Sequence, residues 1–324
     1  MAQDTYLREI KRLSHRNWPD IRSGWVEQVG KLNLEEPGSM PEFAAENVVG
    51  LRQEIESVKS GSGEQRVAFD DYAAPLLHQG IFLLHKSANV LTAAQDQAHS
   101  GMPTWSLATS YQAGLFALDA LLNLMGISVV TYQTRHFLID VWPGPESKLS
   151  KKALASFRHG LEINAIPMTS SIHHYTRWAV LQRLLNTAKQ LPIPDSIIEA
   201  FLNLDDHDFA EQRNDLHYSH TWTFGDIHQY VIDPDLLAID TEEKLLACMS
   251  PKSNMFSYAL GALCFFSASQ LLKSLSTVAP AIEREYARLV ESCDAPRLKS
   301  RATFEAASGL VLSPAVAPAT SAGA

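Results

Sequence analysis

Apolar residues recur along most of the chain at the three- and four-residue spacing of amphipathic helices. This period places the apolar side chains of a segment on one face, which a helix buries against its neighbours. The sequence therefore predicts an all-α fold, a helical bundle. The predicted helices cover residues 41–58, 72–99, 105–125, 151–163, 170–190, 194–202 and 280–293, and the third ends at Gly126, a typical C-terminal cap.

Residues 253–272 form a longer apolar segment without a single charged side chain. Twenty such residues are enough to cross a bilayer as a helix. The segment also contains Ser257, Tyr258, Ser267 and Gln270, which are polar for a helix that faces lipid. A helix that is apolar on nearly all sides is typical of the centre of a large helical domain. We therefore expect a buried core helix.

Interruptions of the helical pattern predict how the chain is divided. Residues 60–63, Ser-Gly-Ser-Gly, are typical of a flexible joint. We expect an N-terminal helical appendage over residues 1–63, itself interrupted at Trp18-Pro19, and a main helical domain over residues 64–304. Residues 221–231 alternate around Gly225-Asp226 and predict a small β-hairpin. Residues 305–324 are rich in Ala, Ser and Pro and predict a disordered tail.

The cysteines indicate a reducing compartment. Cys248, Cys264 and Cys293 form no Cys-x-x-Cys pair, so neither a disulfide framework nor a zinc-finger spacing is present in the sequence. We expect a cytoplasmic protein without a membrane segment. Cys264 lies within the apolar segment and is expected to be a buried small hydrophobe rather than a nucleophile.

Charge is distributed unevenly along a chain whose formal net charge is −9. Residues 131–190 carry eight basic and three acidic side chains, whereas residues 191–250 carry two basic and thirteen acidic ones. An anionic ligand is attracted to the first stretch and repelled by the second. The overall acidic charge argues against a general nucleic-acid coat protein and allows a local basic site.

The segment 211–220, Glu-Gln-Arg-Asn-Asp-Leu-His-Tyr-Ser-His, concentrates the groups that phosphodiester chemistry needs. The Arg213 guanidinium can bind a phosphate and stabilise the charge that builds on it. His217 and His220 can transfer protons near neutral pH, and Asn214 adds an amide. On a helix, Arg213 and His217 lie one turn apart on the same face. These groups suffice, without a metal, for in-line cleavage of RNA by its own 2′-hydroxyl.

Two parts of the sequence resemble the HEPN domain superfamily. Residues 110–127 combine an aromatic residue, small residues, a Leu-Leu pair and a closing Gly, which resembles the first core helix of these domains. About ninety residues later, Arg213-Asn214 and His220, with six residues between Arg and His, resemble the family's Arg-polar-spacer-His motif. The resemblance covers about residues 72–272, and His217 is a second candidate for the motif histidine.

The resemblance implies a helical bundle that forms a homodimer, so that two motifs face each other across one cleft. Many such domains are metal-independent endoribonucleases in toxin or antiviral defence systems, which act on RNA without a cofactor and are compatible with an inhibitory or regulatory protein partner. Others are catalytically inactive modules that bind RNA, nucleotides or proteins. By this analogy Arg213 would bind the scissile phosphate, His220 or His217 would transfer protons, and Asn214 would orient the reacting group.

A metal-dependent phosphohydrolase is a second interpretation. The candidate ligands are His173 or His174, His207, Asp208, and Asp235 or Asp240. Their order resembles the His, His-Asp, Asp order of helical metal-dependent phosphohydrolases, and imidazole and carboxylate ligands of this type would suit two divalent cations and an activated water. The residues that follow Asp208, Phe-Ala-Glu, do not fit the small-residue pattern usual in such enzymes.

A third interpretation is a helical adaptor without catalytic activity. In that case aromatic residues of the N-terminal appendage, Trp18 and Trp25, would bind a protein partner. Ordinary core packing is the competing explanation for each tryptophan.

Overall fold

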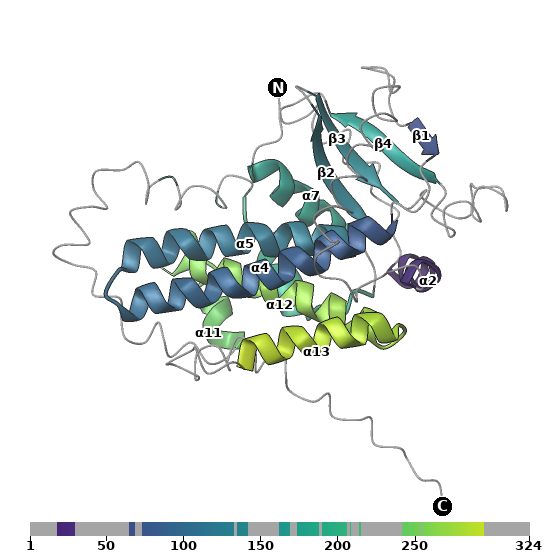
Figure 1. Cartoon of the computed structure of the whole chain (residues 1–324). Coiled ribbons are helices and arrows are strands. Elements are labelled where there is room, and N and C mark those ends of the chain that lie inside the picture. The colour runs from purple at the N-terminus through teal and green to yellow at the C-terminus, as the bar shows by residue number, and fades with distance from the viewer. Residues whose placement is uncertain are drawn as a thin grey trace, which may run out of the picture.

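The computed structural model describes residues 18–29, 65–68, 73–132, 135–141, 162–168, 174–187, 190–205, 242–253 and 255–294, with residues 208 and 214. In this part the protein is mostly helical and has one small antiparallel sheet beside the helices, as Figure 1 shows. The helices are α2 (Trp18–Val29), α4 (Ala73–His99), α5 (Pro103–Leu124), α7 (His174–Thr187), α8 (Asp195–Leu202), α11 (Glu242–Ala247), α12 (Phe256–Ser276) and α13 (Pro280–Asp294).

Most helix predictions within the described residues are confirmed. The predicted segments 72–99, 105–125, 170–190, 194–202 and 280–293 correspond to α4, α5, α7, α8 and α13, with ends that differ by at most four residues. Gly126 has a φ of 79° and donates its N–H to the Asn123 carbonyl at 3.0 Å, so it ends α5 as expected.

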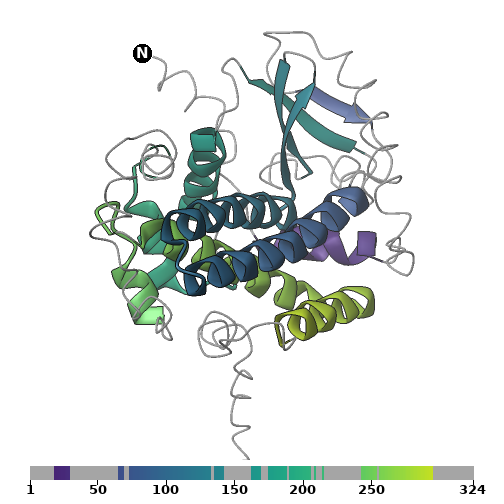
Figure 2. The ribbon, with the colours of Figure 1, turned by 60° about the vertical axis from the view of Figure 1, so that its left-hand side comes forward.

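The centre of the protein consists of α4, α5 and α12, which lie side by side in both views (Figures 1 and 2). Every residue of α12 from Phe256 to Ser269 is buried, which confirms the predicted core helix. Its serines are compatible with burial because the Ser267 and Ser269 hydroxyls donate to the carbonyls of Leu263 and Phe265 one turn earlier. Among the helices that the structure describes, none is long and apolar enough to cross a membrane.

The backbones of α5 and α12 approach each other closely where two glycines meet. A Cβ atom added to Gly261 would lie 2.6 Å from the carbonyl oxygen of Ser110, which is closer than real Cβ contacts. A Cβ atom on Gly114 would lie 3.1 Å from the Cα atom of Gly261. Glycine at position 261 is therefore a requirement of the packing, since any side chain there would push the helices apart.

The sheet has the strand order β1-β4-β3-β2, and all of its pairs are antiparallel. Its strands are β1 (Gln65–Ala68), β2 (Ile127–Tyr132), β3 (Arg135–Asp140) and β4 (Glu162–Met168). Leu138 is paired with Val129 on β2 and Ile166 on β4, and Phe137 and Ile139 are completely buried. Since β2 starts directly after Gly126, the sheet is fixed to the end of α5 and extends the same core.

This sheet corrects the all-α prediction, which included only a hairpin at residues 221–231. The predicted helix 151–163 is also wrong at its end, because Glu162 and Ile163 belong to β4 and pair with Ala68 and Val67. Both errors have one physical cause. Strands of four to seven residues contain only two or three repeats of the two-residue alternation, which is a weak pattern. Their pairing partners are also distant in the sequence.

The N-terminal helix α2 begins at the predicted break, Trp18-Pro19. Proline is favoured in the first turn of a helix, because the N–H that it lacks would have no helical partner there. Trp18 and Ile21 are buried and belong to the same core as α4 and α12. The predicted helix 41–58, the joint 60–63, the hairpin 221–231 and the tail 305–324 lie outside the described residues.

The close crossing of α5 and α12 predicts graded effects of alanine. Gly261→Ala should lower the free energy of unfolding by about 3 kcal/mol, since the new methyl group overlaps a backbone oxygen that cannot rotate away. Gly114→Ala needs a shift of only a few tenths of an ångström, and the better helix propensity of alanine offsets part of its cost. It should cost about 1 kcal/mol or less. Urea denaturation of both variants checks this order, and equal stability of Gly261→Ala and the wild type would contradict it.

Candidate functional site

The structure describes one residue of the predicted catalytic segment. Asn214 is in a helical conformation and its side chain is exposed. Arg213, His217 and His220 lie outside the described residues, so their convergence on one pocket stays a prediction.

The helix that carries the first part of the resemblance, α5, contacts α7 through polar side chains. The Tyr111 hydroxyl and the His174 Nδ1 atom are 3.0 Å apart and share a hydrogen bond, and the two rings are stacked with centroids 6.0 Å apart. Tyr111 is buried, whereas His174 at the first turn of α7 is half-buried. This contact fixes the orientation of an imidazole at the edge of the core.

An ion pair lies two turns further along α5. The Arg177 Nε atom is 2.8 Å from the Asp119 Oδ1 atom. Burial raises the pKa of the Asp119 carboxyl above its ordinary value, and the charge of Arg177 opposes that rise. Arg177 is one of the basic residues of the 131–190 stretch, and its charge is balanced here by an acid of the protein itself.

Two candidate ligands of the metal-dependent interpretation, His174 and Asp208, lie among the described residues. His174 is hydrogen-bonded to Tyr111, and the Asp208 carboxylate accepts the backbone N–H of Asp205 at 2.8 Å. In this part of the chain, no group of three or more His, Cys, Asp or Glu side chains could hold a metal ion. The other candidate ligands, His173, His207, Asp235 and Asp240, lie outside it.

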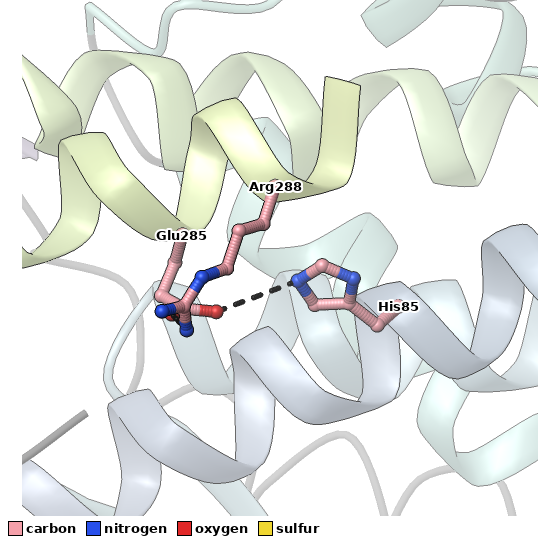
Figure 3. A network of polar contacts seen from close by, with 3 residues as sticks. All are labelled: His85, Glu285 and Arg288. Atoms are coloured by element: carbon pink, nitrogen blue, oxygen red, sulfur yellow. Dashed lines mark hydrogen bonds and ion pairs between the residues drawn. The ribbon is translucent and has the colours of Figure 1, made fainter. Parts of the chain in front are cut away.

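A cluster of three ionisable side chains joins α4 to α13 (Figure 3). The His85 Nε2 atom lies 3.7 Å from one carboxylate oxygen of Glu285, and the Arg288 guanidinium binds the other oxygen at 2.5 Å. The Glu285 side chain is 9% exposed, against 27% for His85 and 52% for Arg288. Burial lowers the pKa of His85 below its ordinary value, Glu285 raises it in part, and Arg288 lowers it. His85 is therefore mostly neutral at pH 7.

Sequence reasoning did not identify this cluster, because His85 and Glu285 are 200 residues apart and meet only after α13 packs on α4. One signal was present. Ile282, Glu285 and Leu289 have the spacing of one helical face, so the pattern places a carboxylate in the middle of the apolar side of α13. A charged residue at such a position needs a partner on the facing helix.

Other conspicuous residues have structural roles. Trp18 is 3% exposed and packs in the core, so it cannot dock a partner without leaving it, and the side chain of Trp25 lies outside the described residues. Cys264 is completely buried as expected, and burial raises the pKa of its thiol far above the range of a reactive thiolate.

Comparison with known proteins gives no relative: no protein-family model, no curated protein and no solved structure matches this chain.

The Asp119–Arg177 ion pair predicts a pH-dependent effect of removing the cation. In Arg177→Met the native pKa of Asp119 should rise further, so the variant keeps a proton that the wild type has already released over the pH range between the native pKa of the wild type and that of the variant. Stability relative to the wild type therefore falls as pH rises through this window. Thermal denaturation should show a loss of about 1 kcal/mol at pH 7 and a clearly smaller loss at pH 4.

The control is Arg183→Met on the same helix, because no ion pair of Arg183 is seen among the described residues. Its effect should be the same at both pH values. A loss in Arg177→Met that does not change with pH would show that Arg177 acts by packing alone.

Proposed function

We propose that this protein is a HEPN-like, metal-independent endoribonuclease that cleaves RNA in a cleft between two copies of the chain, in toxin or antiviral defence. The observation that carries the proposal is Arg213-Asn214 followed by His220 after six residues, about ninety residues beyond the helix at 110–127. A mostly helical protein with that helix at its centre, in α5, is a suitable setting for the motif.

The proposed reaction needs one base, one acid and one cation. A neutral imidazole of His220 or His217 removes the proton of the 2′-hydroxyl, and the 2′ oxygen attacks the adjacent phosphorus in line. The bond from phosphorus to the 5′ oxygen breaks, and an imidazolium donates a proton to that leaving oxygen. The products are a 2′,3′-cyclic phosphate and a 5′-hydroxyl. Arg213 stabilises the negative charge on the pentacoordinate phosphate.

The charges near the motif both help and oppose this reaction. Asp208, Glu211 and Asp215 tend to raise the pKa of a neighbouring histidine, which favours the imidazolium needed as the acid. They also repel RNA, so the proposal needs basic side chains beside the motif. The 131–190 stretch carries such side chains, and a homodimer would place two copies of Arg213 in one cleft.

Removal of motif residues tests the proposal directly. Purified protein should cleave single-stranded RNA in the presence of a chelator, and Arg213→Ala should slow cleavage by about a hundredfold or more. Of His217→Ala and His220→Ala, the variant of the motif histidine should lose about 10²- to 10⁴-fold, and we expect this to be His220. Gel analysis with end-specific phosphatase treatment should identify 2′,3′-cyclic phosphate ends.

The matched control is Arg284→Ala, which removes an exposed guanidinium on α13, far from the motif in sequence, and should leave cleavage unchanged. Activity that disappears with the chelator would favour the metal-dependent phosphohydrolase. RNA binding without cleavage would favour an inactive binding module. Cleavage that survives Arg213→Ala would exclude the proposed mechanism.

A further inference from the structure

The contact between α13 and α4 places a charged cluster where most helices of this size place apolar side chains. Ile282 and Leu289 of α13 are almost completely buried, and Glu285 lies between them on the same face and is also buried. Glu285 is the one polar side chain on the buried face of α13 that the structure describes. Figure 3 shows it between Arg288 of its own helix and His85 of α4.

We propose that the His85–Glu285–Arg288 cluster makes the docking of α13 sensitive to protons: uptake of a proton by His85 favours release of α13 from the helical core. This inference rests on described residues alone and does not depend on the proposed nuclease activity.

The charge balance of the cluster supports this direction. With His85 neutral, the carboxylate of Glu285 and the guanidinium of Arg288 cancel, and the buried contact carries no net charge. A proton on His85 leaves one net positive charge in the contact, on an imidazole whose side chain is 27% exposed. Glu285 attracts that charge at 3.7 Å, but Arg288 repels it and burial opposes it. The protonated form is therefore better accommodated when α13 is undocked and the imidazole is in water.

Few charged side chains are described on the other elements that pack against α4. The single charged side chain of α5, Asp119, is paired with Arg177. The single charged side chain of α12 is Lys273 in its last turn, and Arg22 of α2 donates to the Thr277 hydroxyl. Glu285 and Arg288 are the charged groups that shift the pKa of His85, and the ammonium of Lys86, the next residue of α4, lies over the Phe116 ring.

The position of α13 allows it to open without unfolding the centre. It is the last helix that the structure describes, and it contacts α12 and α4 from outside, while α4, α5 and α12 contact one another directly. Local opening of such a peripheral helix needs less free energy than global unfolding. Its opening would expose Ile282 and Leu289, an apolar surface that is covered at neutral pH.

Hydrogen exchange of the full-length protein tests the proposal. Peptides that cover residues 280–294 should show an opening equilibrium that grows as pH falls from 7.5 to 5.5, after correction for intrinsic exchange rates. The increase is at most about tenfold. At pH 5.5 a solvated histidine with a pKa near 6.5 has about ten times more protonated than neutral form. Peptides from α5 and α12 should not change in parallel.

Two variants assign the effect to the cluster. His85→Gln removes the titrating group, so exchange of α13 should become independent of pH. His78→Gln is the matched control, a histidine on α4 whose pKa burial also lowers but which lies two turns away from His85. It should keep the response of the wild type.

A third variant, Glu285→Gln, removes the attraction for the protonated imidazole and should bring the response closer to the tenfold bound. The proposal is wrong if exchange of α13 in the wild type does not change between the two pH values. It is also wrong if His85→Gln responds as the wild type does, or if the core peptides change in step with α13. The first and third outcomes need no variant, so they hold even if a substitution impairs folding.

Discussion

The close crossing of α5 and α12 is the constraint on which the rest of the structure depends. Gly114 and Gly261 let the two backbones meet without intervening side chains, and the Ser110 carbonyl occupies the place of a Cβ atom at position 261. Dispersion forces between atoms so close are stronger than across a gap. Residues 256–269 of α12 are all buried around this contact. Since α5 continues into β2 and α12 is followed by α13, this one contact sets the positions of both the sheet and the last described helix.

Such a close-packed centre also determines where chemistry can occur. Several polar groups in this centre are satisfied internally: the Ser87 hydroxyl donates to the Ala113 carbonyl, and the Gln95 amide donates to the Tyr258 hydroxyl at 3.0 Å. Burial raises the pKa of Tyr258, so its phenol stays protonated. The described polar clusters with partly exposed members lie around this centre, in the α5–α7 contact and in the α13 cluster.

Whether the sequence predicts a feature of this protein depends on how far apart in the chain the interacting residues are. The helices α4, α5 and α12 were predictable because each contains several turns of its own apolar pattern, and Gly126 marks a local backbone conformation. The strands were missed because pairs such as Ala68 with Glu162 join segments far apart in the chain. The residues of the 211–220 segment were found from their chemistry alone, and the structure adds only that Asn214 is exposed. The contact of His85 with Glu285 also joins residues far apart in the chain, so it could be identified only from the folded structure.

A buried carboxylate on the apolar face of α13 is costly by comparison with an aliphatic side chain. Desolvation of the Glu285 carboxylate offsets part of its attraction to its partners, whereas leucine at this position would add its transfer free energy to that of Ile282 and Leu289. Docking by leucine, however, would be equally strong at every pH between 5 and 8, since aliphatic packing does not titrate. An ionisable group in a hydrophobic contact gives up docking strength and makes docking depend on protons. In the α4–α13 contact that dependence belongs to His85, the one member of the cluster whose ordinary pKa is close to neutral.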